Sequence, residues 1–107
     1  MELTNSKKNG YEVIEFEGSL DTASSPAAEK EINTLIESGI VKFVFNFEKT
    51  KYMSSSGLRV LLATAKKLKG KGELKISNLN PVITEVFDVS GFSTILNVYK
   101  TEEDALA

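Results

Sequence analysis

An almost continuously apolar run, IVKFVFNF at residues 40–47, constrains the fold of this chain more than any other segment. It is rich in β-branched and aromatic residues, and only Lys42 and Asn46 interrupt it. A run of this kind is typical of a central strand in a parallel sheet, where helices cover both faces. It is far too short to span a bilayer. We therefore expect a buried strand here, with helices packed on either side.

Helical patterns flank this run. Ahead of it, Ser24 and Ser25 precede Pro26, an order that suits an N-cap followed by a proline in the first turn. Gly39 is placed to end that helix in a left-handed conformation. After the run, apolar residues recur at helical spacing over residues 58–68, with basic residues on the solvent side. The alternation of helix and strand predicts parallel strands joined by helical crossovers.

The remaining segments complete an α/β pattern. Asn9 and Gly10 tolerate the positive φ angles of a two-residue type I′ turn, so the chain is predicted to begin with a β-hairpin. Further elements are expected as a strand over 73–78, a helix from Asn80 to Gly91, a strand over 94–100 and a helix capped by Thr101. The sequence thus predicts a single α/β domain over residues 1–107, with a mostly parallel central sheet, an N-terminal hairpin and about four helices.

The composition excludes several classes of function. A net charge of −2 argues against nucleic acid, because binding to it needs a concentrated basic surface. The absence of cysteine excludes thiolate metal sites and thiol catalysis, and the absence of histidine removes the commonest general base and metal ligand. The N-terminal residues do not resemble a signal peptide. We expect a cytoplasmic monomer that binds no metal, no membrane and no nucleic acid.

Three consecutive serines, Ser54, Ser55 and Ser56, stand before Gly57 and the helical segment that follows. One interpretation is a catalytic nucleophile, but a serine needs a neighbouring base to accept its proton. The chain has no histidine, no Ser-x-x-Lys and no Gly-x-Ser-x-Gly, since Met53 occupies the place of the first glycine. We therefore do not expect an enzyme.

Two other interpretations of the serines stay open. A serine at an N-cap stabilises a helix by about 1 kcal/mol, and one such serine needs no further explanation. The chain also lacks the glycine-rich motifs of nucleotide-binding loops. Even so, hydroxyls at a helix start lie beside free N–H groups and the positive end of the helix dipole, which suits an anion that is either bound or covalently attached. The serines are either a helix cap alone or a cap that also carries a removable charge.

The stretch YMSSSGLRVLL at residues 52–62 resembles the signature of STAS domains, in particular that of the bacterial anti-sigma-factor antagonists. FEGSLDTASSPAAEKEI at residues 16–32 is similar to the family's Gly-x-Leu-Asp segment, and KFVFNFEKTKYMSSSGL at residues 42–58 resembles its central strand and loop. The last stretch of the chain resembles the C-terminal portion of the family over residues 74–106, LKISNLNPVITEVFDVSGFSTILNVYKTEEDAL. Together these stretches cover nearly the whole chain in order.

The resemblance implies roles for five residues. Ser55 corresponds to the family's phosphoacceptor serine, with Ser54 where many relatives have aspartate and Ser56 where they have serine or alanine. Gly57 is the glycine of the signature. Asp21 corresponds to the acid of the Gly-x-Leu-Asp segment, which in the family lies near the phosphoacceptor and the partner-binding surface. These five residues are the predicted partner-binding site.

By the same resemblance, the unphosphorylated chain is expected to bind a kinase-type anti-sigma factor and so to release a sigma factor. That kinase would use ATP and Mg²⁺ to phosphorylate Ser55, and a phosphatase would remove the phosphate. The antagonist itself would need no cofactor. Two departures from the family pattern can alter which kinase is recognised: Asn46 replaces an aspartate common at the end of the central strand, and Ser54 replaces the aspartate often found before the phosphoserine.

Simpler roles and a different function are also consistent with these residues. An acid in a loop before a helix, such as Asp21, is more often a turn or capping residue, and Ser56 is interpreted as a cap or packing residue. STAS domains also occur in sensory assemblies, anion transporters and lipid-transport systems. The alternative function is therefore a scaffold or ligand-binding subunit of a sensory complex or of a lipid-transport system.

Overall fold

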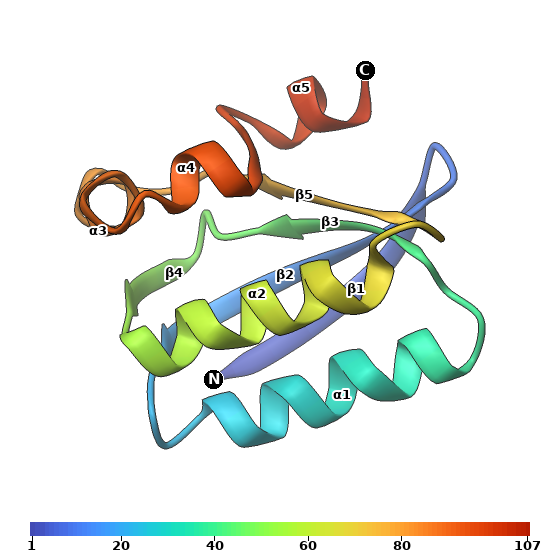
Figure 1. Cartoon of the computed structure of the whole chain (residues 1–107), viewed down its shortest axis with the longest axis horizontal. Helices are drawn as coiled ribbons and strands as arrows, with labels where there is room; N and C mark the ends of the chain where they lie inside the picture. Colours follow the sequence, from blue (N-terminus) through green and yellow to red (C-terminus); the bar gives the residue numbers. More distant parts are fainter.

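The computed structural model describes residues 1–107 and contains six strands and five helices (Figure 1). In chain order these elements are β1 (Glu2–Lys8), β2 (Tyr11–Leu20), α1 (Ser25–Glu37), β3 (Lys42–Asn46), β4 (Thr50–Met53), α2 (Ser55–Leu68), β5 (Glu73–Ser77), α3 (Pro81–Ser90), α4 (Phe92–Ile95), β6 (Asn97–Tyr99) and α5 (Glu102–Leu106).

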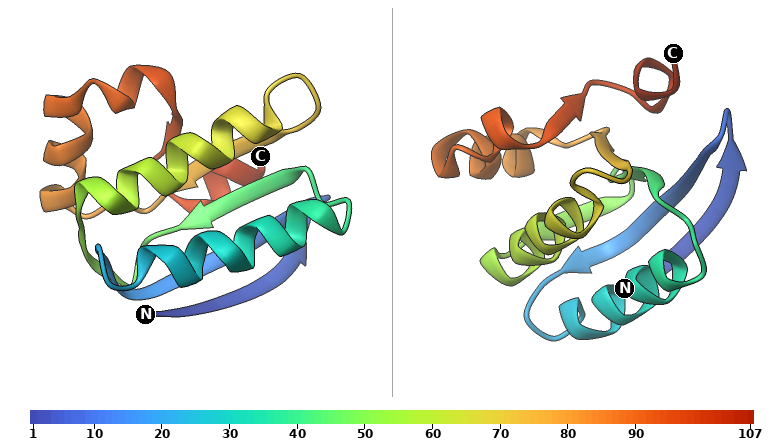
Figure 2. Two further views of the ribbon diagram at one scale, coloured as in Figure 1. Left: turned by 60° about the horizontal axis from the view of Figure 1, so that its bottom comes forward. Right: turned by 45° about the vertical axis from the view of Figure 1, so that its right-hand side comes forward.

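The strands form a mostly parallel sheet in the order β1-β2-β3-β5-β6, with β4 paired to the end of β2. Only β1 runs antiparallel to its neighbour, and Asn9 and Gly10 join it to β2 with φ angles of 52° and 83°. Figures 1 and 2 show α1 and α2 side by side on one face of the sheet, with α5 on the other. The predicted α/β fold and its N-terminal hairpin are confirmed.

β3 is the central strand that the apolar run predicts, and both of its faces are covered. Phe43 and Phe45 are completely buried in the main core beneath α1 and α2. Val44 belongs to a smaller cluster on the opposite face, together with Val13 of β2 and Ala105 of α5. Because β2, β3 and β5 are parallel, the loops that follow them emerge at the same end of the domain.

One predicted strand is shorter than expected. The strand expected over residues 94–100 comprises only Asn97–Tyr99, because Phe92–Ile95 forms the short helix α4. Gly91 ends α3 with a φ angle of 77°, and its carbonyl accepts hydrogen bonds from both the N–H and the hydroxyl of Thr94. This turn removes the first residues of the predicted strand from the sheet. The chain therefore has five helices where about four were predicted.

The sequence does not predict β4, which pairs with the last residues of β2. Its residues are buried at both ends and exposed in the middle, and a strand this short shows no recognisable period. The register between β2 and β4 shifts between Gly18 and Ser19, where Gly18 has a φ angle of 112°. A bulge of this kind bends its strand. β2 can therefore pair with β3 along its first part and with β4 at its end.

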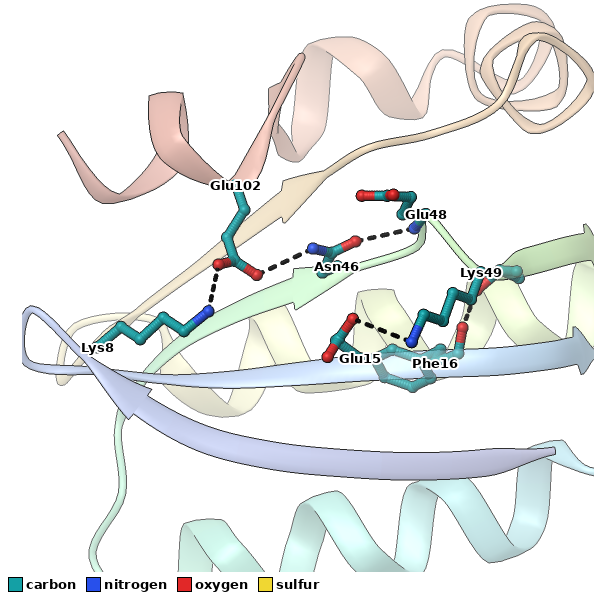
Figure 3. Close-up of polar contacts among 8 residues, drawn as sticks. Lys8, Glu15, Phe16, Asn46, Glu48, Lys49 and Glu102 are labelled. Atoms are coloured by element: carbon teal, nitrogen blue, oxygen red, sulfur yellow. Dashed lines mark hydrogen bonds and ion pairs between the residues drawn. The ribbon is translucent and has the colours of Figure 1, made fainter.

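α5 is held against the sheet by polar contacts of its first residue (Figure 3). The Glu102 carboxylate accepts hydrogen bonds from the Lys8 ammonium at 2.8 Å and from the Asn46 amide at 2.9 Å. The Asn46 side-chain oxygen accepts one from the Glu48 N–H at 2.8 Å. The hydrogen bond from Lys8 lowers the pKa of Glu102, and the bond from Asn46 adds to this against the opposing effect of burial. The Asn46 side chain therefore stabilises the position of α5, whereas an aspartate at this position would repel Glu102.

Replacing Asn46 with aspartate is expected to destabilise the domain. The new carboxylate would lose the amide donor and would face Glu102 as a like charge, which should lower the free energy of unfolding by about 1–3 kcal/mol. Urea unfolding near neutral pH measures this change. Asn97→Asp is the control, because Asn97 is exposed and the substitution adds the same charge. A loss no larger than that of the control would contradict the role assigned to Asn46.

The contacts of Glu102 also predict a dependence of stability on pH. The pKa of Glu102 is lower in the folded protein than its ordinary value, so its contribution is fully present above that ordinary value. The contribution is lost as the pH falls through the lowered pKa of the folded state. Thermal unfolding of the wild type and of Glu102→Gln should therefore differ most at neutral pH and converge in acid. A difference that stays constant from about pH 7 to about pH 3 would contradict this assignment.

Candidate functional site

Three segments meet where β2 ends: the last residues of β2, the loop before α1, and the junction between β4 and α2. The Leu20 carbonyl accepts a hydrogen bond from the Ser54 N–H at 2.9 Å. Leu20 also pairs with Met53 in the ladder between β2 and β4. The loop that begins at Asp21 therefore lies next to the three serines. We call the residues Asp21, Thr22, Ser54, Ser55 and Ser56 the serine surface.

Ser54 is the N-cap of α2. Its backbone is extended, with φ −89° and ψ 176°, and its hydroxyl oxygen accepts a hydrogen bond from the Gly57 N–H at 3.4 Å. Its carbonyl accepts the N–H of Leu58 at 3.0 Å. The cap predicted ahead of this helix is confirmed, and it is the first of the three serines that provides it.

Ser55 is the first residue of α2, and its side chain is exposed. Its hydroxyl has no hydrogen-bond partner in the protein, unlike the hydroxyls of Ser54 and Ser56. The N–H groups of Ser55 and Ser56 are also free, because they precede the first hydrogen bond of the helix. The site therefore presents an accessible hydroxyl beside unpaired backbone donors at the positive end of the helix dipole.

Ser56 joins the two halves of the serine surface. Its hydroxyl lies 3.1 Å from the hydroxyl of Thr22, which belongs to the loop before α1. Of the two roles predicted for Ser56, the structure shows the packing contact and no cap. No role for Thr22 at this site was predicted from the sequence. The signal that could have identified it is its hydroxyl, which directly follows Asp21 in the Gly-x-Leu-Asp segment.

Gly57 lets α2 begin close to the end of β2. A Cβ atom at this position would lie 2.6 Å from the Leu20 carbonyl oxygen and 2.9 Å from side-chain carbons of Leu20 and Met53. Gly57 is itself buried. It therefore positions the serines and presents no side chain of its own to a partner.

The Asp21 side chain stabilises the turn that precedes α1. Its Oδ1 accepts hydrogen bonds from the N–H groups of Ala23 at 3.1 Å and Ser24 at 3.0 Å. The bond from the Ser24 N–H is the largest effect that lowers the pKa of Asp21, and the ammonium of Met1 also contributes. Asp21 is therefore a charged turn residue, as the simpler interpretation predicted, and because the residue is partly exposed it remains part of the serine surface.

The start of α1 differs in detail from the sequence prediction. Ser24 occupies the N-cap position, but its hydroxyl caps no N–H of the helix. That hydroxyl donates instead to the Ser19 carbonyl at 2.8 Å and accepts the Asp21 N–H at 3.0 Å. Ser25 is the first helical residue and is buried, and Pro26 follows in the first turn as predicted. Ser24 thus stabilises the loop that carries Asp21.

The structure offers no metal centre at this or any other place. No group of three or more aspartate or glutamate side chains comes close enough together to hold a metal ion. The chemistry of the site is therefore that of hydroxyls, backbone N–H groups and one carboxylate.

None of the five helices combines the length and the apolar character that crossing a membrane requires.

This geometry agrees with comparisons to known proteins. The family model of the STAS domain matches residues 3–105. The chain belongs to the STAS domain family. BtrV of Bordetella bronchiseptica, provisionally designated an anti-sigma factor antagonist, is 35% identical over 100% of this chain and 93% of its own length. The anti-sigma-B factor antagonist of Bacillus subtilis is 28% identical over 91% of this chain and 90% of its own.

Solved structures of other proteins share the fold of this domain. An anti-sigma factor antagonist from Mycobacterium paratuberculosis superposes with a TM-score of 0.91, at 23% identity, over 98% of this chain and 90% of its own. The Bacillus cell fate determinant SpoIIAA in its phosphorylated form superposes with a TM-score of 0.74, at 27% identity, over 98% and 96%. The match extends across the whole STAS domain, including the elements that carry the serine surface.

Gly57→Ala is expected to displace the first turn of α2 or to destabilise the domain. The added methyl group overlaps the Leu20 carbonyl, and overpacking of this kind lowers the free energy of unfolding by about 1–3 kcal/mol. Ser55→Ala is the matched control, because it changes an exposed neighbour that makes no contact through its hydroxyl. Denaturant unfolding of the two variants measures the difference. Equal stability would show that Gly57 does not set the approach of α2 to β2.

Proposed function

We propose that this STAS protein is an anti-sigma-factor antagonist that a phosphate on Ser55 switches off. In its unphosphorylated form, the serine surface binds a kinase-type anti-sigma factor, which then releases its sigma factor. The designations of BtrV and of the Bacillus subtilis anti-sigma-B factor antagonist support this role. The single observation that carries the mechanism is the exposed, unpartnered hydroxyl of Ser55 at the first position of α2.

The phosphoryl transfer requires no catalytic group from this chain. The partner kinase transfers the γ-phosphoryl group of ATP, bound with Mg²⁺, to the hydroxyl oxygen of Ser55, and ADP leaves. The hydroxyl proton passes to a base of the kinase. A phosphatase restores the hydroxyl by hydrolysis. The antagonist supplies the acceptor oxygen and the surface on which the kinase docks.

The phosphate acts differently within the domain and at the interface. It adds about −1.5 to −2 charges and three acceptor oxygens. Within the domain, the helix dipole and the free N–H groups of Ser55 and Ser56 stabilise this charge. At the interface, the same group is bulky and strongly hydrated, and it adds negative charge to a surface that already carries the Asp21 carboxylate. The partner is therefore released while the fold is retained.

Phosphorylation and binding assays test this proposal. The wild type, incubated with the kinase-type anti-sigma factor of its own genome and ATP, should carry phosphate on Ser55, and Ser55→Ala should carry none. Ser55→Ala should bind the same partner without ATP within about threefold of the wild type, because it leaves the contacts of the domain intact and adds neither charge nor bulk to the interface. Ser55→Asp should bind at least about tenfold more weakly, because it places a charge in the interface.

Ser93→Asp is the control for charge alone, because Ser93 is exposed in α4 and outside the serine surface. It should bind like the wild type. Phosphate mapped to another residue, or equal affinities of Ser55→Asp and Ser93→Asp, would overturn the mechanism.

A further inference from the structure

Arg59 stands on α2, one helical turn after Ser55, and its side chain is exposed. We propose that its guanidinium group pairs with the phosphate on Ser55 and holds that phosphate against the first turn of α2. This inference rests on the proposed function, because it concerns the phosphorylated state of the same serine. It assigns to Arg59 the recognition of a phosphate monoester within its own chain.

The helix places the two side chains together. Residues four positions apart on a helix are neighbours on its surface, with Cβ atoms about 5–6 Å apart. Side chains of a helix also tilt toward its N-terminus, so the long side chain of Arg59 can extend back over the first turn, where Ser55 lies. A phosphate on Ser55 is thus within reach of the guanidinium group.

Arg59 is free to make this contact. The two ion pairs of the domain join Lys8 with Glu102 and Lys49 with Glu15, and Arg59 takes part in neither. Its side chain makes no hydrogen bond within the chain. The planar guanidinium group can donate two parallel hydrogen bonds to a phosphate, which makes such pairs stronger than a point-charge contact.

Arg59 borders an open groove between α1 and α2. The groove has a volume of about 590 Å³, and Ser56, Arg59 and Lys66 of α2 line it opposite Thr22 and Glu29. Figure 2 shows the two helices that border it. Arg59 and Ser55 are both exposed, so the guanidinium group has open space on its side of α2.

The other charges around the groove favour Arg59 as the partner of the phosphate. The Glu29 carboxylate lies on the opposite side of the groove, and Asp21 lies in the loop before α1; both carboxylates repel a phosphate. The Met1 ammonium interacts with Asp21. Lys66 lies on α2 about two turns beyond Arg59, so its interaction with a group at the first turn is weaker. Arg59 is therefore the cation that should determine the ionisation of the phosphate.

A titration of phosphoserine measures this pairing directly. Phosphoserine is incorporated at Ser55 during translation, so the sample does not depend on the kinase, and ³¹P NMR follows its second ionisation. The phosphate pKa in the wild type should lie about 0.3 or more below that in Arg59→Gln, because the cation stabilises the doubly charged form. Arg59→Lys should fall between them, since it keeps the charge and loses the paired donors.

Lys66→Gln is the matched control, because it removes one positive charge from the same groove and should leave the phosphate pKa close to that of the wild type. Circular dichroism checks that each variant is folded. Equal phosphate pKa values in the wild type and Arg59→Gln, or equal effects of Arg59→Gln and Lys66→Gln, would overturn the inference. A different result would contradict the proposed function, namely the absence of phosphate on Ser55 after incubation with the kinase.

Discussion

The close approach of α2 to the end of β2 is the contact on which the serine surface depends. It exists because Gly57 has no side chain, which leaves the Leu20 carbonyl free to lie against the first turn and to accept the Ser54 N–H. The bulge at Gly18 contributes by directing the end of β2 toward β4. Packing within the chain thus explains why a small residue is needed at position 57.

Each residue of the serine surface has a distinct physical task. Ser54 caps the helix, Ser56 joins it to the loop through Thr22, and Asp21 shapes that loop. These contacts leave Ser55 as the serine whose hydroxyl is not used by the fold. A charge can therefore be attached there without breaking a hydrogen bond of the domain, which is what a reversible switch at this position requires. Arg59 has a corresponding task in the phosphorylated state, where it pairs with the phosphate. It is the cation of α2 that lies nearest to Ser55, and no other group of the chain engages it.

Much of this arrangement could be predicted from the sequence. The apolar run around Phe45, the Asn9-Gly10 turn, the helix start at Asn80-Pro81 and the cap at Thr101 all depend on local residue types, and the structure confirms them. β4 could not be predicted, because it is a short strand that exists only through pairing with β2. The role of Asn46 could not be predicted from the sequence either. Its partner Glu102 is 56 residues away, so only the packed fold shows why an amide is needed there.

The most direct test of the account compares the phosphorylated and unphosphorylated protein by NMR, alone and with the partner anti-sigma factor. The account predicts that phosphate on Ser55 changes amide shifts only in the serine surface and the first turns of α1 and α2. It also predicts that the phosphate weakens partner binding by about a hundredfold or more, since a buried like-charge contact costs several kcal/mol. Unchanged affinity of the phosphorylated protein, or shift changes throughout the sheet, would contradict a switch that acts through local charge on an unaltered fold.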